Sequence, residues 1–196
     1  QAFNAGLPTA KAPDLRERTQ YKLGWVQYEQ KQYPAALATF QNQIKELPQG
    51  PLAGEANFLA GESQFRQDKF ADALPFYAIV GATKVERFHA KALYRSGVCA
   101  TNLKQWPQAQ QHFTALTQTF PQFEQIHEAR FGLGFALQSQ SQFEPARQTY
   151  LQVTKESRTE TAAKARFMMG HCSLAEKKLP EATDHFLEAA FGYPYE

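Results

Sequence analysis

One template recurs five times along this chain of 196 residues. Each copy has a glycine, a bulky apolar residue nine places later, an alanine three places after that, and an aromatic residue four places further on. The glycines are Gly24, Gly61, Gly97, Gly134 and Gly170, and the aromatic residues are Phe40, Tyr77, Phe113, Tyr150 and Phe186. The period is 36 or 37 residues, and the spacings inside the template do not vary. Such a period predicts a stack of repeated supersecondary units.

Each copy is predicted to form two helices that pack as an antiparallel pair. The glycine lies in the first helix, as in residues 90–103, and a short polar turn follows it. Pro34, Pro107 and Pro180 open the second helix, where the amide that proline lacks would have no partner. The glycine and alanine are expected to let the ring of the paired helix approach closely. No stretch alternates like a strand, so the predicted class is all-α.

Pro75 departs from this pattern because it falls about five residues into the second helix of its copy. Proline in a helix interior removes one backbone hydrogen bond and bends the helix. The sequence therefore predicts a kink or a shifted helix start at Pro75.

Composition excludes several classes of protein. The chain is 43% hydrophobic and 20% charged, which is typical of a folded protein, and its formal charge is only +2. No apolar run approaches the roughly 18 residues of a membrane span, so direct membrane insertion is not expected. The residue six positions before each template glycine, called the second place, is charged, and its charge alternates in sign from copy to copy. This alternation argues against a nucleic-acid partner. That column is Arg18, Glu55, Lys91, Glu128 and Lys164.

The sequence contains no recognisable catalytic or metal-binding motif. The stretch "HEARF" (127–131) lacks the second histidine of a zinc-protease helix. His171 next to Cys172 has no other ligand nearby in sequence, so no metal, cofactor or enzymatic activity is predicted. Cys99 and Cys172 occupy equivalent places two copies apart, beyond disulfide reach in a helical stack, and are expected to be free, buried thiols.

The repeated template resembles the tetratricopeptide repeat. Leu23-Gly24, Ala36-x-x-x-Phe40 and Pro48 show the resemblance most fully. It implies a right-handed α-solenoid of antiparallel helix pairs, with about five repeats. The stretches "AKALYRSG" and "EARFGLG" also resemble repeats of bacterial envelope proteins, namely the Tol-Pal coordinator and the outer-membrane barrel-assembly lipoprotein. That second resemblance favours the bacterial periplasm or cell envelope.

The expected organisation is one solenoid over residues 1–196. Its repeats are predicted at about 17–53, 54–89, 90–126, 127–162 and 163–196, with 1–14 as the remnant of a preceding repeat or as a cap. Phe3 at one end, and Phe191, Tyr193 and Tyr195 at the other, are expected to be uncovered apolar groups. Since each unit of a stack buries its face on a neighbour, the ends are predicted either to belong to a longer array or to mediate self-association.

The resemblance implies that the first helices line a concave surface that binds a protein or peptide. The groove candidates are Trp25, Tyr28, Phe65 and Phe135, because rigid rings bind peptides at low entropic cost. Lys91 and Arg95 match half of the clamp with which related chaperone-binding proteins hold a carboxylate, and they predict an anionic contact. The aromatic rings three positions before each template glycine, called the fifth-place rings, include Phe58 and Phe131. They either line this groove or pack against the preceding unit.

Two functions are therefore open. The first is a non-catalytic scaffold that binds a protein or peptide on its concave surface. The alternative is a structural or assembly segment of a larger bacterial envelope protein, which acts through its ends and its convex face.

Overall fold

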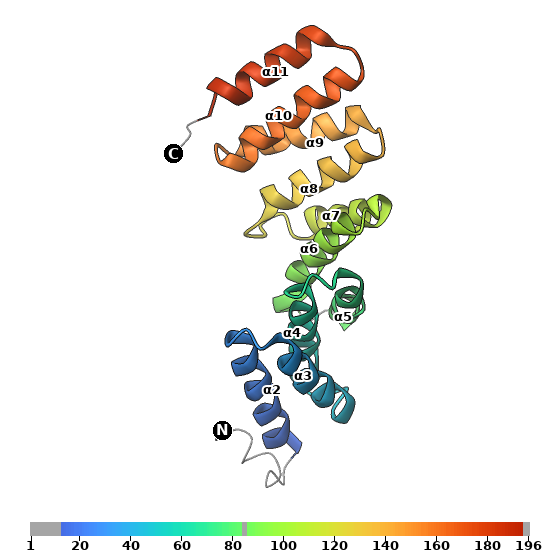
Figure 1. The fold of residues 1–196 in the computed structure, drawn as a ribbon, viewed down its shortest axis with the longest axis vertical. Coiled ribbons are helices and arrows are strands. Elements are labelled where there is room, and N and C mark those ends of the chain that lie inside the picture. Colours follow the sequence, from blue (N-terminus) through green and yellow to red (C-terminus); the bar gives the residue numbers. More distant parts are fainter. Residues whose placement is uncertain (1–12, 84–85, 194–196) are drawn as a thin grey trace. The chain divides into compact units, whose positions relative to one another are not determined.

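A computed structural model of the chain describes residues 13–83 and 86–193. Those residues form helices joined by short turns, with no strand among them, which confirms the all-α prediction (Figure 1). The helices are α2 (Pro13–Glu29), α3 (Tyr33–Glu46), α4 (Ala53–Phe65), α5 (Phe70–Thr83), α6 (Glu86–Asn102), α7 (Trp106–Thr119), α8 (Ile126–Ser139), α9 (Phe143–Glu156), α10 (Glu160–Ala175) and α11 (Leu179–Phe191).

The chain forms two compact units, Gln1–Cys99 and Ala100–Glu196. Within the first unit α2 packs on α3, and α4 packs on both α3 and α5. Within the second, α8 packs on α7 and α9, while α10 packs on α9 and α11. The pairs α8–α9 and α10–α11 run antiparallel across their turns, as predicted (Figure 1). The first helices of successive pairs also touch, α2 with α4 and α8 with α10.

The second helices all begin at the same place of the template, at Tyr33, Phe70, Trp106, Phe143 and Leu179. Proline occupies the first turn of α3, α7 and α11, as predicted. Pro75 lies inside α5, yet α5 still begins at Phe70, so the predicted shift of the helix start is wrong. Pro75 is exposed. Because proline has no N–H, it donates no hydrogen bond to the carbonyl of Ala71, which lies four residues earlier.

Each first helix ends in a turn with one residue in the left-handed backbone conformation. In the turn after α8, Ser141 has φ of 60°, and its N–H donates to the carbonyl of Gln138 (2.8 Å). The N–H of Gln142 donates to the carbonyl of Leu137 (3.0 Å), which completes a Schellman motif. The same pair of bonds recurs in every such turn. The left-handed residues are Lys31, Asp68, Lys104, Ser141 and Lys177.

Ser141→Gly is expected to stabilise the protein by about 0.5–1 kcal/mol, because glycine has no Cβ to clash in the left-handed conformation. Urea unfolding followed by circular dichroism measures the change. Ser139→Gly is the matched control, since Ser139 is the last residue of α8 and has helical geometry. There glycine should destabilise the protein by a few tenths of a kcal/mol. Equal changes at the two sites would contradict the prediction.

The template glycines lie directly against aromatic rings of the paired helix. A Cβ built on Gly134 would lie 2.5 Å from Cε1 of Tyr150, and one on Gly61 would lie 2.8 Å from Cε1 of Tyr77. Gly24 meets Phe40 and Gly170 meets Phe186 in the same way. The template alanines of the second helices are buried as well. The predicted close approach of the paired helices is therefore confirmed at these four glycines.

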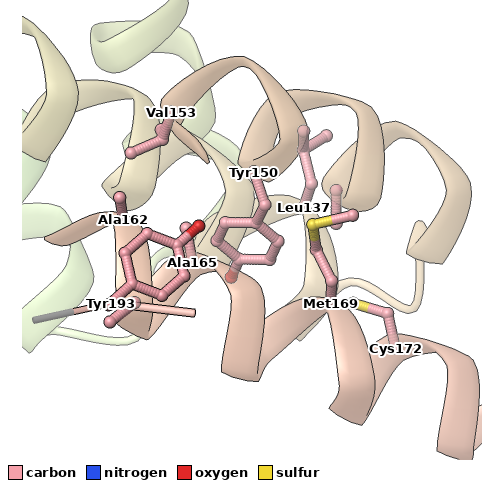
Figure 2. Close-up of a cluster of buried hydrophobic side chains, with 10 residues drawn as sticks. Leu137, Tyr150, Val153, Ala162, Ala165, Met169, Cys172 and Tyr193 are labelled. Atoms are coloured by element: carbon pink, nitrogen blue, oxygen red, sulfur yellow. The ribbon is translucent and has the colours of Figure 1, made fainter. Parts of the chain in front are cut away.

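The core of the second unit lies between α8, α9 and α10. Tyr150 and Val153 are fully buried there beneath the small side chains Ala162 and Ala165 of α10. Figure 2 shows the ring of Tyr193 beside Ala162 and Ala165. Tyr193 is only 7% exposed, so the prediction that it is an uncovered terminal ring is wrong. Tyr193 packs against α10, which a linear count of repeat places does not reveal.

The other predicted terminal groups have different outcomes. Phe191 is 83% exposed, in agreement with the prediction. Phe3 and Tyr195 lie outside the described residues, as does most of the segment 1–14. The predicted repeat boundaries and the single continuous solenoid stay predictions.

Candidate functional site

Five of the six candidate groove residues belong to the first unit: Trp25, Tyr28, Phe65, Lys91 and Arg95. Trp25 lies on α2 and is 47% exposed, which is unusual for the largest apolar side chain. Lys91 lies on α6 and is exposed. Tyr28, Phe65 and Arg95 are half-buried. Of the candidate rings, Trp25 therefore offers the most surface to a partner.

Tyr28 and Phe65 occupy equivalent places at the ends of α2 and α4, and each packs against the first residue of the next helix. The rings of Tyr28 and Tyr33 meet edge to face with centroids 5.5 Å apart. Phe65 and Phe70 repeat this contact at 5.4 Å. Such pairs stabilise the turn beyond the area they bury. These rings therefore fix the hairpins and leave only their outer edges for a partner.

A buried ion pair joins α4 to α6. Nε of Arg95 donates to Oε1 of Glu62 (2.7 Å), and one terminal nitrogen of the guanidinium donates to Oε2 (3.0 Å). The hydroxyl of Tyr77 on α5 also donates to Oε1 (2.6 Å). The side chain of Glu62 is 6% exposed and that of Arg95 is 26% exposed. One carboxylate thus ties three consecutive helices together.

The network changes the acidity of the groups around Glu62. Burial disfavours the charge of Arg95, but the adjacent carboxylate outweighs it and raises the pKa of the guanidinium. Burial, followed by the negative charge of Glu62, raises the pKa of Tyr77. Burial and then Glu62 also raise the pKa of the Cys99 thiol to about 12. All three groups therefore keep their protons at neutral pH.

Arg95 also covers an aromatic ring. Its guanidinium carbon lies 4.5 Å from the ring centroid of Phe65, a cation–π contact. Because Glu62 already holds Arg95 in a bidentate pair, the guanidinium positions Phe65 and its charge is balanced within the fold. The sequence contained a signal for this pair. Glu62 directly follows its template glycine, and it is the only acidic residue at that position. The other copies have Trp25, Val98, Phe135 and His171 there.

A second polar contact joins α2 to the end of α4. Nε of Arg66 donates to the hydroxyl oxygen of Tyr28 (3.2 Å), and the guanidinium itself is exposed. Burial raises the pKa of Tyr28, so the hydroxyl stays protonated. The name aromatic–basic face is used below for Trp25, Tyr28, Phe65, Arg66 and Lys91, a set that we propose forms one surface. It combines one exposed ring, two ring edges and two cations.

Phe135, the sixth candidate, belongs to the second unit. Its ring meets Trp106 edge to face with centroids 5.7 Å apart, and it is half-buried. The fifth-place ring Phe131 packs against Tyr150 of its own helix pair (5.6 Å). In the first unit Phe58 packs on Tyr77 in the same way (5.9 Å). Phe58 also stacks on Phe88 of α6, with centroids 4.7 Å apart. These two rings therefore pack with the core, and their packing against the preceding unit stays a prediction.

The two cysteines are free and buried, as predicted. Burial raises the pKa of Cys172 to about 11. His171 is exposed and its ring lies 4.6 Å from Phe167 and 5.4 Å from Phe186, between centroids. The described part of the chain has no group of three potential metal ligands. Within the same residues, no helix is both long and apolar enough to span a bilayer.

Comparison with known proteins shows two matches to tetratricopeptide repeat models, at residues 21–83 and 91–122. No curated protein matches the chain in sequence. The structure is similar to that of MamA, with a TM-score of 0.79 at 14% identity over 88% of this chain and 89% of that one. MamA 41-end from Desulfovibrio magneticus RS-1 gives 0.74 at 15% identity over 89% and 93%.

A third similar structure is YrrB, described as a TPR protein with an unusual peptide-binding site. Its TM-score is 0.78 at 17% identity, over 96% of this chain and 91% of that one. At such identities the likeness concerns the fold alone. The repeat models, the helix-pair fold and the glycine–ring contacts agree with one another. Residues 21–83 and 91–122 are therefore tetratricopeptide repeats, and the helix-pair fold is the one that this family forms.

Proposed function

We propose that this chain is a non-catalytic scaffold that binds a peptide or protein segment along a concave surface, and that the aromatic–basic face is where the partner lies. The exposure of Trp25 is the observation that carries this proposal. An exposed tryptophan on a well-formed helix is a typical anchor for a protein partner. The fold of a protein interaction scaffold supports it.

The chemistry of the face indicates the kind of partner. Trp25, with the edges of Tyr28 and Phe65, suits an apolar side chain of the partner. The cations of Arg66 and Lys91 suit a nearby carboxylate. Arg95 holds Phe65 in place and does not itself receive the anion. The proposed ligand is therefore an extended or helical peptide with an apolar anchor close to an acidic residue, and no nucleic acid is expected.

To test this, peptides that bind the unmodified chain are selected from a random display library, and their dissociation constants are then measured for each variant. Trp25→Ala is expected to weaken the selected peptides at least about tenfold, since it removes the anchor contact. Leu179→Ala is the matched control, because Leu179 is exposed on α11 in the other unit. It should leave the dissociation constant unchanged.

Intrinsic fluorescence gives an independent readout. The chain has two tryptophans, Trp25 and Trp106, so a Trp106→Phe variant reports on Trp25 alone. Peptide binding should shift its emission because the ring leaves water. Selected peptides that bind Trp25→Ala as tightly as the unmodified chain, with no emission shift, would overturn the proposed face.

The second candidate function is an assembly segment of a larger bacterial envelope protein, which acts through its ends and convex face. One observation favours it. Among described residues, large apolar side chains with high exposure gather on α10 and α11. Those on these two helices are Phe167, Leu174, Leu179, Leu187 and Phe191, and those elsewhere are Leu15, Trp25 and Ile79. Such a concentration is typical of a protein interface.

A further inference from the structure

Arg66 differs from the other arginine side chains described in the first unit because no carboxylate pairs with it. The others are each held by an acidic side chain: Arg16, Arg18 and Arg95. The guanidinium of Arg66 is exposed at the end of α4 and donates to a neutral hydroxyl, that of Tyr28 (3.2 Å). Glu62 also attracts Arg66, but that carboxylate already pairs with Arg95. Arg66 therefore presents a positive charge that no ion pair among the described residues neutralises.

Tyr28 fixes the direction of this guanidinium. Its ring packs edge to face on Tyr33, with centroids 5.5 Å apart, and its hydroxyl accepts the Nε–H of Arg66. Because Nε is used in this bond, the two terminal nitrogens of the guanidinium remain for a ligand. Two such nitrogens match the two oxygens of a carboxylate, which they bind through parallel hydrogen bonds.

The oriented guanidinium lies close to the exposed anchor of the proposed face. Tyr28 follows Trp25 by three residues in α2, so the two side chains share one side of that helix. Tyr28 in turn contacts Arg66 directly, so one side chain links the exposed indole to the cation. The sequence marks the same residue, because Arg66 is the only cation five positions after a template glycine. The other copies have Glu29, Asn102, Ser139 and Ala175 there.

We propose that Arg66 receives a carboxylate of the bound peptide through its two terminal nitrogens, and that the hydroxyl of Tyr28 positions it. The carboxylate belongs to an acidic side chain or to the C-terminus of the peptide, since both offer the same two oxygens. Arg66 is then the residue that selects acidic partners, which rests on the proposed peptide-binding role and makes it more specific. Lys91 is also positive, but an ammonium has no planar fork, so it attracts an anion without fixing its geometry.

Double-mutant cycles between the chain and its peptides test this role. Peptides that bind the unmodified chain are synthesised with each acidic residue replaced by its amide, and separately with an amidated C-terminus. Arg66→Gln should weaken the acidic peptide at least about tenfold and should hardly affect the peptide that lacks the carboxylate. Arg16→Gln is the matched control. Arg16 lies nine residues before Trp25, on the opposite side of α2, and its loss should change neither affinity.

Tyr28→Phe isolates the positioning role, because it removes only the hydroxyl and keeps the ring that packs on Tyr33. The affinity for the acidic peptide should fall about threefold or more, with no change for its amide counterpart, since the guanidinium loses its orientation. Arg66→Lys keeps the charge but should not restore the affinity, because an ammonium cannot form the two parallel bonds. Circular dichroism of each variant measures whether the helices are intact.

The results separate the role of Arg66 from the function on which it rests. Equal losses for the acidic peptide and its amide counterpart in Arg66→Gln, or selected peptides that need no carboxylate, would overturn the role of Arg66 and leave the Trp25 anchor standing. Peptides that bind Trp25→Ala as tightly as the unmodified chain would overturn the proposed face itself. A coupled loss at an acidic residue assigns the carboxylate to a side chain, and one at the amidated end assigns it to the C-terminus. Either of these two results supports the role of Arg66.

Discussion

Arg95→Leu is expected to lower the free energy of unfolding by about 3–5 kcal/mol, because it leaves the buried carboxylate of Glu62 without its counter-charge. The loss should be far larger than the removal of a surface cation would cause. Leucine fills a similar volume along the stem of arginine, so the effect reports the charge and not a cavity. Urea unfolding followed by circular dichroism measures it.

The control and the rescue variant make the result specific. Arg18→Leu removes an arginine from an exposed pair with Asp14 on α2 and should change stability by less than about 1 kcal/mol. The double variant Glu62→Leu, Arg95→Leu should be more stable than Arg95→Leu alone, since it removes the buried charge as well. A single variant within about 1 kcal/mol of the unmodified chain would contradict the network described above.

Gly134→Ala should destabilise the protein by about 1–3 kcal/mol, although alanine is the better helix former. The new Cβ would lie 2.5 Å from the ring of Tyr150, which is fully buried. That ring cannot easily move away. Its hydroxyl donates to Oε1 of Gln138 (3.0 Å), and Phe131 packs against its face. Thermal or urea unfolding of the variant measures the change.

Gly81→Ala is the matched control because the same Cβ meets no close contact among the described residues. Gly81 lies in α5, and the nearest atom to a built Cβ is Nε2 of His89, 4.0 Å away. There the helix propensity of alanine should dominate and stabilise the protein by up to about 1 kcal/mol. Opposite signs at the two glycines identify ring contact as the reason for the template glycine. Equal signs would refute that explanation.

The network around Glu62 also bears on the proposed binding face. Arg95 holds the ring of Phe65, and Phe65 closes the turn against Phe70. The position of Phe65 in the proposed face therefore depends on the buried carboxylate of Glu62. If the face binds peptides as proposed, the double variant without Glu62 and Arg95 should weaken binding through the position of Phe65.

Much of the fold followed from local chemistry. The starts of the second helices, the turns and the glycine–ring contacts all lie within one helix pair. Their spacing is fixed by 3.6 residues per turn and by the size of a side chain. Pro75 was predicted to cause a kink or a shifted start, and α5 keeps its start at Phe70 with the proline in its interior. The kink stays a prediction.

The candidate site followed less completely. The sequence singled out Trp25 and Arg95 as candidates for contact with a partner, and that role stays a prediction. It did not reveal that Arg95 pairs with Glu62 inside the fold. Glu62 and Arg95 are 33 residues apart in the chain, and their contact depends on how one helix pair stacks on the next. The burial of Tyr193 against α10 is a similar case. Neither contact repeats through the template. The glutamate at position 62 was the one departure in the sequence that pointed to the ion pair, and no spacing pointed to the burial of Tyr193.

The sequence by itself determined the helix pairs, their turns and their close packing, because each of these depends on residues within one copy of the template. Only the tertiary structure decided which charges are neutralised inside the fold and which apolar side chains stay in water. The physical reason is that burial and ion pairing depend on distances of a few ångströms between helices, and no spacing along the chain fixes those distances.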